Sequence, residues 1–170
     1  MSNPVLIAYA TAYGSTMEVA EAIAERLRAG GLTADLKPAK EVRSLEGYGA
    51  VLLGAPLIMF RWHKDAHRFL SRQQKALVER QVAVFALGPT HDPHDEAEWK
   101  DAQKQLAKEL AKHPWLKPVE VKMFGGKYDP AKLRFPLSLM AGQVPASDIR
   151  DWGAIQAWAG GLIPILGERQ

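Results

Sequence analysis

The sequence predicts an α/β fold in which one parallel β-sheet of five strands carries helices on both faces. Short, apolar, β-prone segments alternate along the chain with longer segments of helical periodicity, and strands that alternate with helices form parallel sheets. Two of the expected strands, 50–55 and 82–87, are apolar at every position, as strands covered on both faces should be. The 170 residues suffice for one well-buried domain and are too few for two ordinary ones, so 1–170 is expected to be a single domain.

Each expected element has a local signal. The segments with the composition of strands are 5–9, 32–36, 50–55, 82–87 and 119–124. The segments with helical periodicity are one that ends at Gly30, then about 63–77, 96–112, and one that begins near Asp148. Segment 32–36 alternates apolar and polar residues, which is typical of a strand near the edge of a sheet.

One long segment does not fit the alternation of strands and helices. Residues 127–147, here called the insert, lie between the fifth strand and the last helix and contain three prolines. A loop of this length in a compact domain usually has a function. Its apolar centre, flanked by Lys127, Lys132 and Arg134, could touch a bilayer surface or a quinone. Alternatively it packs back over the sheet edge or against a second copy of the chain in a homodimer.

Composition excludes several functions. The chain has no cysteine, which rules out disulfides, thiolate nucleophiles and iron–sulfur ligation, so redox chemistry would need a bound cofactor. The net charge of +3 is too small to predict nucleic-acid binding. No basic segment precedes the apolar residues 5–10, and the apolar stretch 154–166 is interrupted and short. We therefore expect a cytoplasmic protein, with membrane contact that is at most peripheral at the inner face of the membrane.

The loop after the first strand, residues 11–16, has the sequence Thr-Ala-Tyr-Gly-Ser-Thr. It combines hydroxyl side chains with a glycine and an immediate helix start, where backbone N–H groups and the helix dipole favour an anion. Ser15 and Glu18 also form a capping-box pattern that needs no ligand. The position directly after the first strand favours phosphate. No lysine follows the glycine and G-x-G-x-x-G is missing, which argues against triphosphates and dinucleotides.

This loop resembles the phosphate loop of the flavodoxin family, T/S-x-T-G-x-T, with Tyr13 in place of the middle hydroxyl residue. The resemblance implies a flavodoxin-like three-layer sandwich with strand order 2-1-3-4-5, and FMN as cofactor. It assigns the FMN phosphate to Thr11, Ala12, Tyr13, Gly14, Ser15 and Thr16. It assigns the flavin ring to the loops after the third and fourth strands, with Pro56, Leu57, Ile58, Met59, Phe60, Trp62, Leu87, Gly88, Pro89, Thr90 and His91.

The loop after the third strand is unusually apolar. Its side chains could cover a flat aromatic ring, with Phe60 and Trp62 as the candidates for stacking, or they could plug the top of the sheet. His91, in the loop after the fourth strand, could reach the ring as a hydrogen-bond or proton partner. The His-Asp-Pro-His-Asp run that it begins is expected to be a solvated loop and not a metal site.

Within this superfamily the chain most resembles the menaquinone-dependent protoporphyrinogen dehydrogenases. The matching segments are 54–55 with the apolar loop that follows, Trp62-His63, Phe69, 124–128 and 149–152. The insert departs from that family, whose insert is longer and richer in arginine and aromatic residues. The resemblance implies an FMN-dependent oxidoreductase with a porphyrinogen as substrate and a quinone as acceptor.

A second hypothesis is a flavodoxin-type electron carrier that has no substrate of its own and docks briefly with redox partners. The charge of +3 argues against it, because electron-shuttling flavodoxins are typically acidic. The basic residues of segment 61–80 are either a solvated helix face or a docking surface for an anionic group.

Overall fold

The computed structural model describes residues 3–133, 135–140 and 142–167. Five parallel strands form its sheet: β1 (Val5–Tyr9), β2 (Ala34–Pro38), β3 (Ala50–Ile58), β5 (Gln81–Leu87) and β6 (Glu120–Phe124). They lie in the order β2-β1-β3-β5-β6. Because β4 is only a short antiparallel addition, this is the predicted order 2-1-3-4-5 of the parallel strands. The predicted α/β fold is confirmed.

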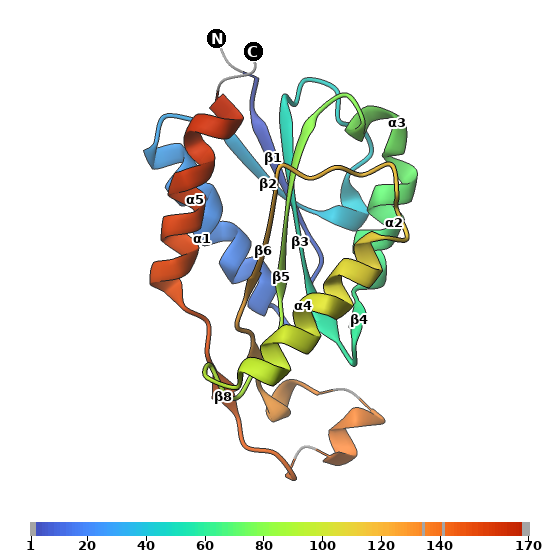
Figure 1. Ribbon diagram of the computed structural model, residues 1–170, viewed down its shortest axis with the longest axis vertical. Coiled ribbons are helices and arrows are strands. Elements are labelled where there is room, and N and C mark those ends of the chain that lie inside the picture. The colour runs from blue at the N-terminus through green and yellow to red at the C-terminus, as the bar shows by residue number, and fades with distance from the viewer. Residues whose placement is uncertain (1–2, 134, 141, 168–170) are drawn as a thin grey trace.

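Helices cover both faces of the sheet (Figure 1). One face carries α1 (Ser15–Ala29) and α5 (Trp152–Gly167), and the other carries α2 (Lys64–Arg72), α3 (Gln74–Leu77) and α4 (Glu96–Leu110). Each face has its own buried core. In β3, Leu52 belongs to the core beneath α1 and α5, whereas Val51 and Leu53 belong to the opposite core. Successive strand residues point to opposite faces, which explains why this strand is apolar throughout.

The chain between β3 and α2 differs from the prediction. The sequence favours a loop after residue 55, but β3 continues to Ile58 and pairs with β4 (Arg61–Trp62) in an antiparallel hairpin. The two turn residues, Met59 and Phe60, have φ angles of 50° and 66°. A two-residue hairpin turn of this kind favours Asn and Gly, because side chains strain the left-handed backbone. We call residues 56–62 the β3–β4 hairpin.

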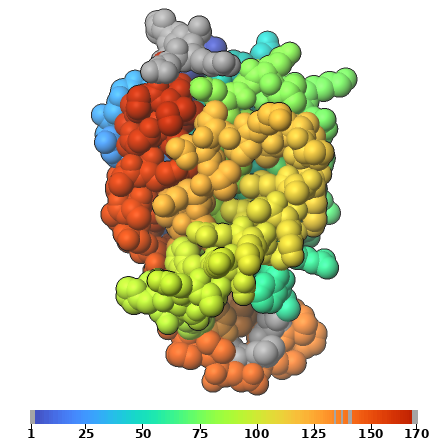
Figure 2. Space-filling model, viewed as in Figure 1, coloured from blue at the N-terminus to red at the C-terminus, as the bar shows by residue number. Residues whose placement is uncertain are grey.

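The insert also contains structure that the sequence does not predict. Its first strand, β7 (Lys127–Tyr128), pairs with β8 (Ser147–Asp148) in a small antiparallel sheet. Between them lie the short 3₁₀ helices η2 (Pro130–Lys132) and η3 (Leu137–Met140); a further one, η1 (Ala39–Glu41), follows β2. In the space-filling view the insert forms an orange lobe at one end of the molecule, beside the yellow-green start of α4 (Figure 2). The insert therefore lies over the carboxyl ends of the strands.

Two smaller differences concern the ends of elements. Strand β2 begins at Ala34, two residues later than expected, and α5 begins at Trp152, because Ser147 and Asp148 belong to β8. None of the helices described here has both the length and the apolar composition needed to cross a bilayer.

Candidate functional site

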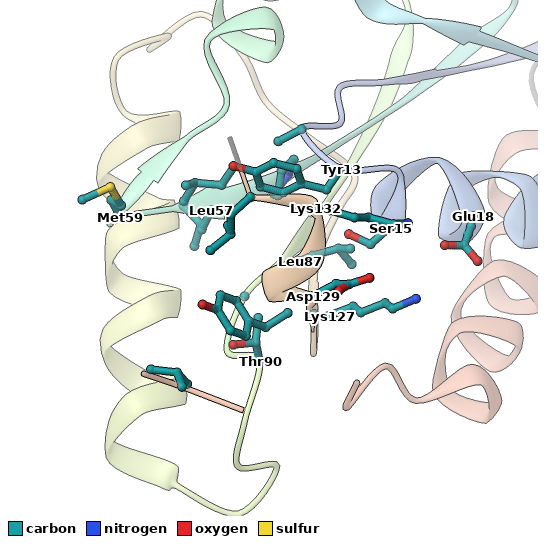
Figure 3. A pocket seen from close by; sticks show the side chains of 18 residues that line it. Tyr13, Ser15, Glu18, Leu57, Met59, Leu87, Thr90, Lys127, Asp129 and Lys132 are labelled. Carbon is teal, nitrogen blue, oxygen red and sulfur yellow. The ribbon is translucent and has the colours of Figure 1, made fainter. Parts of the chain in front are cut away.

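A cavity of about 380 Å³ lies at the carboxyl end of the sheet, between the insert and the loops after β1, β3 and β5. Its volume falls within the range of roughly 300–1,000 Å³ that is usual for small-molecule sites. The lining residues are Ala12, Tyr13, Ser15, Glu18, Pro56, Leu57, Ile58, Met59, Leu87, Gly88, Thr90, Gly126, Lys127, Tyr128, Asp129, Lys132, Leu133 and Val144. In Figure 3, Ser15 and Glu18 lie toward one end of the cavity and Met59 toward the other. The site thus has a polar end at α1 and a mostly apolar remainder.

Loop 11–16 forms the polar end. Gly14 is the N-cap residue of α1 and has a φ of 94°, a conformation that favours glycine. The backbone N–H of Gly14 donates to the Thr11 hydroxyl at 2.8 Å, which holds the loop together. No side chain of the described residues caps the helix start, so the capping-box alternative for Ser15 is wrong. The free N–H groups of the first turn remain available to an anion.

Thr16 adds a second polar group to this helix start. Its side chain is fully buried, and its hydroxyl has no hydrogen-bond partner among the described residues. A buried hydroxyl without a partner is unfavourable, and such groups in native proteins call for an explanation. Thr11, Gly14 and Thr16 do not themselves line the cavity in this conformation, whereas Ala12, Tyr13 and Ser15 do.

The β3–β4 hairpin supplies one apolar wall. As expected, Pro56 and the three residues after it line the cavity. The expectation that Trp62 covers the ring is not met: its side chain is only 2% exposed, belongs to the core beneath α2 and α4, and donates from Nε1 to the Ala55 carbonyl at 3.0 Å. Phe60 does not line the cavity either, because it occupies the exposed tip of the hairpin. Residues 56–59 of this loop therefore line the cavity, whereas Trp62 packs into the core.

The loop after β5 contributes less than expected. Leu87, Gly88 and Thr90 line the cavity, whereas Pro89 and His91 do not. The Pro89 carbonyl accepts a hydrogen bond from Gly126 at 2.8 Å. His91 contacts the Thr90 hydroxyl at 2.8 Å and the Pro145 carbonyl at 3.1 Å, and the Ser147 hydroxyl donates to the Thr90 carbonyl. This loop therefore mainly holds the insert in place.

The insert supplies a wall that the sequence assignment missed. The unexpected lining residues are Glu18, Gly126, Lys127, Tyr128, Asp129, Lys132, Leu133 and Val144. Tyr128 is the aromatic residue that the insert presents to the cavity, and its ring lies 5.3 Å from that of His91, at an interplanar angle of 47°. Gly125 and Gly126, directly after a parallel strand, were the signal that could have identified this wall, since ligands bind at the carboxyl ends of such strands.

Arg150 joins the end of the insert to the start of α1. Its guanidinium donates to both carboxylate oxygens of Asp148, at 2.9 and 2.8 Å, and to the Ser15 carbonyl at 3.2 Å. It also pairs with Glu18 at 3.4 Å and lies 4.8 Å from the centre of the Trp152 ring. The hydrogen bonds between Arg150 and Asp148 lower the pKa of the carboxyl and raise the pKa of the guanidinium. Both groups are therefore charged at neutral pH and fix the insert beside the helix start.

Parts of the basic segment 61–80 have structural roles. Arg72 donates to the carbonyls of Ala39 and Val42, at 2.9 and 3.3 Å. Arg80 donates to the carbonyls of Tyr48 and Leu45, at 2.9 and 3.1 Å. These two side chains fix the connection between β2 and β3.

The chain is similar to known proteins in its fold and in its sequence profile. No curated protein sequence matches the chain significantly. Many solved structures have a similar fold, among them the following three. A flavodoxin from the domain Archaea superposes with a TM-score of 0.59 at 12% identity, covering 97% of this chain and 99% of that one. Oxidised flavodoxin 2 from Bacillus cereus gives 0.57 at 17% identity, covering 97% and 98%. Rubredoxin oxygen:oxidoreductase from Desulfovibrio gigas gives 0.58 at 18% identity, and 98% of this chain matches 36% of that larger protein.

At these identities the structures show the fold alone. The sequence profile of the flavodoxin domain family matches residues 6–141, which is most of the chain and includes all three loops around the cavity. The chain therefore belongs to the flavodoxin domain family, and FMN is the cofactor that this membership implies.

Proposed function

We propose that this chain is an FMN-dependent oxidoreductase that holds the cofactor in the cavity and passes electrons between reactants at the cavity mouth. The observation that carries the proposal is the polar end of an otherwise apolar cavity. There α1 begins without a side-chain cap. In the same turn, behind the residues that line the cavity, the buried Thr16 hydroxyl has no partner in the described chain. A monophosphate accepts hydrogen bonds from both kinds of donor, and a flat apolar ring suits the rest of the cavity.

The residues of the chain bind and orient the cofactor, and the flavin supplies the electron-transfer chemistry. Loop 11–16 would hold the phosphate through the first-turn N–H groups and the Thr16 hydroxyl. Leu57, Leu87 and Leu133 exclude water from the ring. Tyr128 offers the ring an aromatic partner from the insert. No side chain is required as a nucleophile.

The cavity of about 380 Å³ is near the lower end of the range for small-molecule sites and has room for the cofactor alone. The reactant would therefore approach the mouth of the cavity and not its interior. The hairpin, which forms one wall of the cavity, exposes Met59 and Phe60, at 74% and 75%, and the insert, which forms another, exposes Phe135 and Leu139. These surfaces favour an apolar reactant. We extend the proposal to oxidation of a porphyrinogen with a quinone as acceptor, on the strength of the sequence resemblance given above.

The second candidate is an electron carrier with no substrate of its own. It is favoured by the similarity to flavodoxins over the full length of both chains. In that case the exposed apolar residues at the mouth would contact a redox partner protein.

Two measurements test the proposal. Titration of the apoprotein with FMN, followed by quenching of flavin fluorescence, should show stoichiometric binding; absence of flavin uptake refutes both candidates. Redox titration and turnover then separate them. Oxidation of protoporphyrinogen IX with a soluble quinone supports the enzyme. Reduction in two well-separated one-electron steps, without turnover, supports the carrier.

A further inference from the structure

A buried polar cluster lies between the β3–β4 hairpin and helices α2 and α4. It consists of His67, Glu109 and His113, none of which lines the cavity. Glu109 is only 3% exposed, which is unusual for a carboxylate unless it is paired. In Figure 1, β4 lies at the same end of the sheet as the start of α4 and beside α2. The cluster therefore connects the back of a cavity wall to two helices.

Glu109 fixes the hairpin directly. Its Oε2 accepts hydrogen bonds from the backbone N–H of Trp62 at 3.0 Å and from Nε2 of His67 at 2.8 Å. Its Oε1 accepts from Nζ of Lys112 at 2.7 Å. Because β4 is an edge strand, the N–H of Trp62 has no neighbouring strand to pair with, and the carboxylate takes that place.

The hairpin needs such an anchor. It pairs with β3 at two residue pairs, Leu57 with Trp62 and Ile58 with Arg61, and a two-stranded hairpin of this length is marginal alone. The Trp62 indole adds one bond to the Ala55 carbonyl at 3.0 Å. Its turn residues, Met59 and Phe60, both have strained left-handed backbones. Loss of the bond from Glu109 to Trp62 would leave a buried N–H without a partner and allow the turn to relax.

The histidine pair makes this anchor sensitive to protonation. Nδ1 of His67 lies 2.8 Å from Nε2 of His113, and the two ring planes are inclined by 23° with centroids 5.1 Å apart. When both rings are neutral, His113 donates to His67, which donates to Glu109. One added proton is tolerated: on Nδ1 of His113 it leaves the pair unchanged, and on Nδ1 of His67 it requires the other tautomer of His113. A second proton would place two N–H groups against each other and break the pair.

The charged groups that face the pair are Glu109 and Lys112 of the α4 segment, while Trp115 packs edge-on against His113. Burial, His67 and Lys112 lower the pKa of His113, and Glu109 opposes them. The lowered pKa means that His113 is neutral near neutral pH and takes up a proton only in acid.

We propose that Glu109 is a positioning residue for the cofactor: by holding Trp62 it fixes the wall formed by Leu57, Ile58 and Met59, and the His67–His113 pair weakens this anchor in acid. The proposal rests on the proposed FMN site. It differs from a purely structural role because it predicts a change in cofactor affinity in protein that remains folded.

The test compares Glu109→Ala, Glu109→Gln and Glu98→Ala, the last being an exposed carboxylate on the same helix. At pH 7.5, Glu109→Ala should weaken FMN binding about fivefold or more, because a buried donor loses its partner. Glu109→Gln keeps an oxygen for Trp62 and should stay within about twofold of wild type, as should Glu98→Ala. Circular dichroism confirms that each variant is folded. If Glu109→Ala does not fold, Glu109→Gln and the pH series below still decide the proposal.

A second readout uses the apoprotein and needs no flavin. Arg61 is exposed beside the turn, so trypsin should cut after it faster in Glu109→Ala than in wild type or Glu98→Ala. If wild type binds no FMN, the proposed function fails, while this readout still shows whether Glu109 anchors the hairpin. Faster cleavage with unchanged FMN affinity would overturn the positioning role, as would unchanged values of both.

The pH dependence completes the test. Between pH values of about 7.5 and 5, wild type should lose more FMN affinity than His113→Asn, in which the second proton cannot be placed on an imidazole pair. Comparing the two proteins removes the contribution of the FMN phosphate, which titrates in both. Identical pH profiles would overturn the role of the histidine pair.

Discussion

The sharpest prediction concerns Thr16→Val. Valine has nearly the shape of threonine and a similar helix propensity, so the substitution removes the hydroxyl and leaves the packing of the first turn of α1 almost unchanged. In the apoprotein this hydroxyl is buried and has no partner among the described residues. Its removal should therefore leave the free energy of unfolding unchanged or increase it by up to about 1–3 kcal/mol, which is the cost of an unsatisfied buried group.

The same substitution should weaken cofactor binding. If the hydroxyl donates to the FMN phosphate, the variant loses a hydrogen bond to a charged group, worth about 1.5–3 kcal/mol. The dissociation constant for FMN should then rise roughly 10- to 150-fold. Riboflavin, which has the same ring and no phosphate, should bind the variant and wild type alike.

The assay is flavin fluorescence quenching with FMN and with riboflavin, together with urea unfolding of the apoprotein. An apoprotein that is destabilised by the substitution, with unchanged FMN affinity, would show that Thr16 is a structural residue and that the phosphate is held elsewhere. A loss of affinity that is equal for FMN and riboflavin would also contradict the assignment.

Three further predictions follow from the site and its surroundings. Tyr128→Leu should weaken FMN and riboflavin binding by a similar factor of about 2–10, which corresponds to one aromatic contact. Tyr128→Phe and the remote Tyr48→Phe should leave both affinities unchanged. Equal flavin affinities of Tyr128→Leu and wild type would exclude ring contact by the insert. Replacing Met59-Phe60 with Asn-Gly should raise the free energy of unfolding of the apoprotein by about 1 kcal/mol or more in urea, because these residues suit the left-handed turn. It should also weaken FMN binding, because Met59 lines the cavity. An unchanged free energy of unfolding would show that the turn is not strained. Finally, the free energy of unfolding should fall in acid. Burial would raise the pKa of Glu109, but hydrogen bonds from Lys112, His67 and Trp62 outweigh burial and hold it at about 2, against 4.5 ordinarily. The stability that this carboxylate contributes is present above pH 4.5 and is lost as the pH falls toward 2. The lowered pKa of His113 adds a loss of stability that begins below pH 6.5. Urea unfolding across this pH range should show both losses, and an unchanged pH profile of stability in Glu109→Gln would contradict the assignment.

The sequence predicted the cofactor loops because their signals are local. A glycine between hydroxyl residues, placed directly after an apolar strand, fixes both a backbone conformation and a helix start. Of the residues assigned to FMN, the structure brings together around one cavity Ala12, Tyr13, Ser15, Pro56, Leu57, Ile58, Met59, Leu87, Gly88 and Thr90. They converge because the carboxyl ends of parallel strands meet at the same edge of the sheet.

Other residues could not be assigned in this way. Trp62 and Phe60 look alike to a sequence argument, as large aromatic side chains in one apolar segment. The antiparallel pairing of β4 directs Trp62 into the core and leaves Phe60 at the tip of a turn, and that register is set by tertiary packing. Tyr128 and Glu109 act on or near the site from distant parts of the chain, so no local pattern marks them.

The sequence by itself therefore determined the α/β class, the order of its elements and the glycine-containing loop at the start of α1, since each depends on periodicity, composition or turn chemistry within a few residues. Only the tertiary structure decided which apolar side chains face the cavity, that the insert forms one of its walls, and that a buried carboxylate holds the opposite wall. These depend on strand register and on contacts between residues 40 or more positions apart, such as Trp62 with Glu109, which separate segments acquire only when they fold against each other.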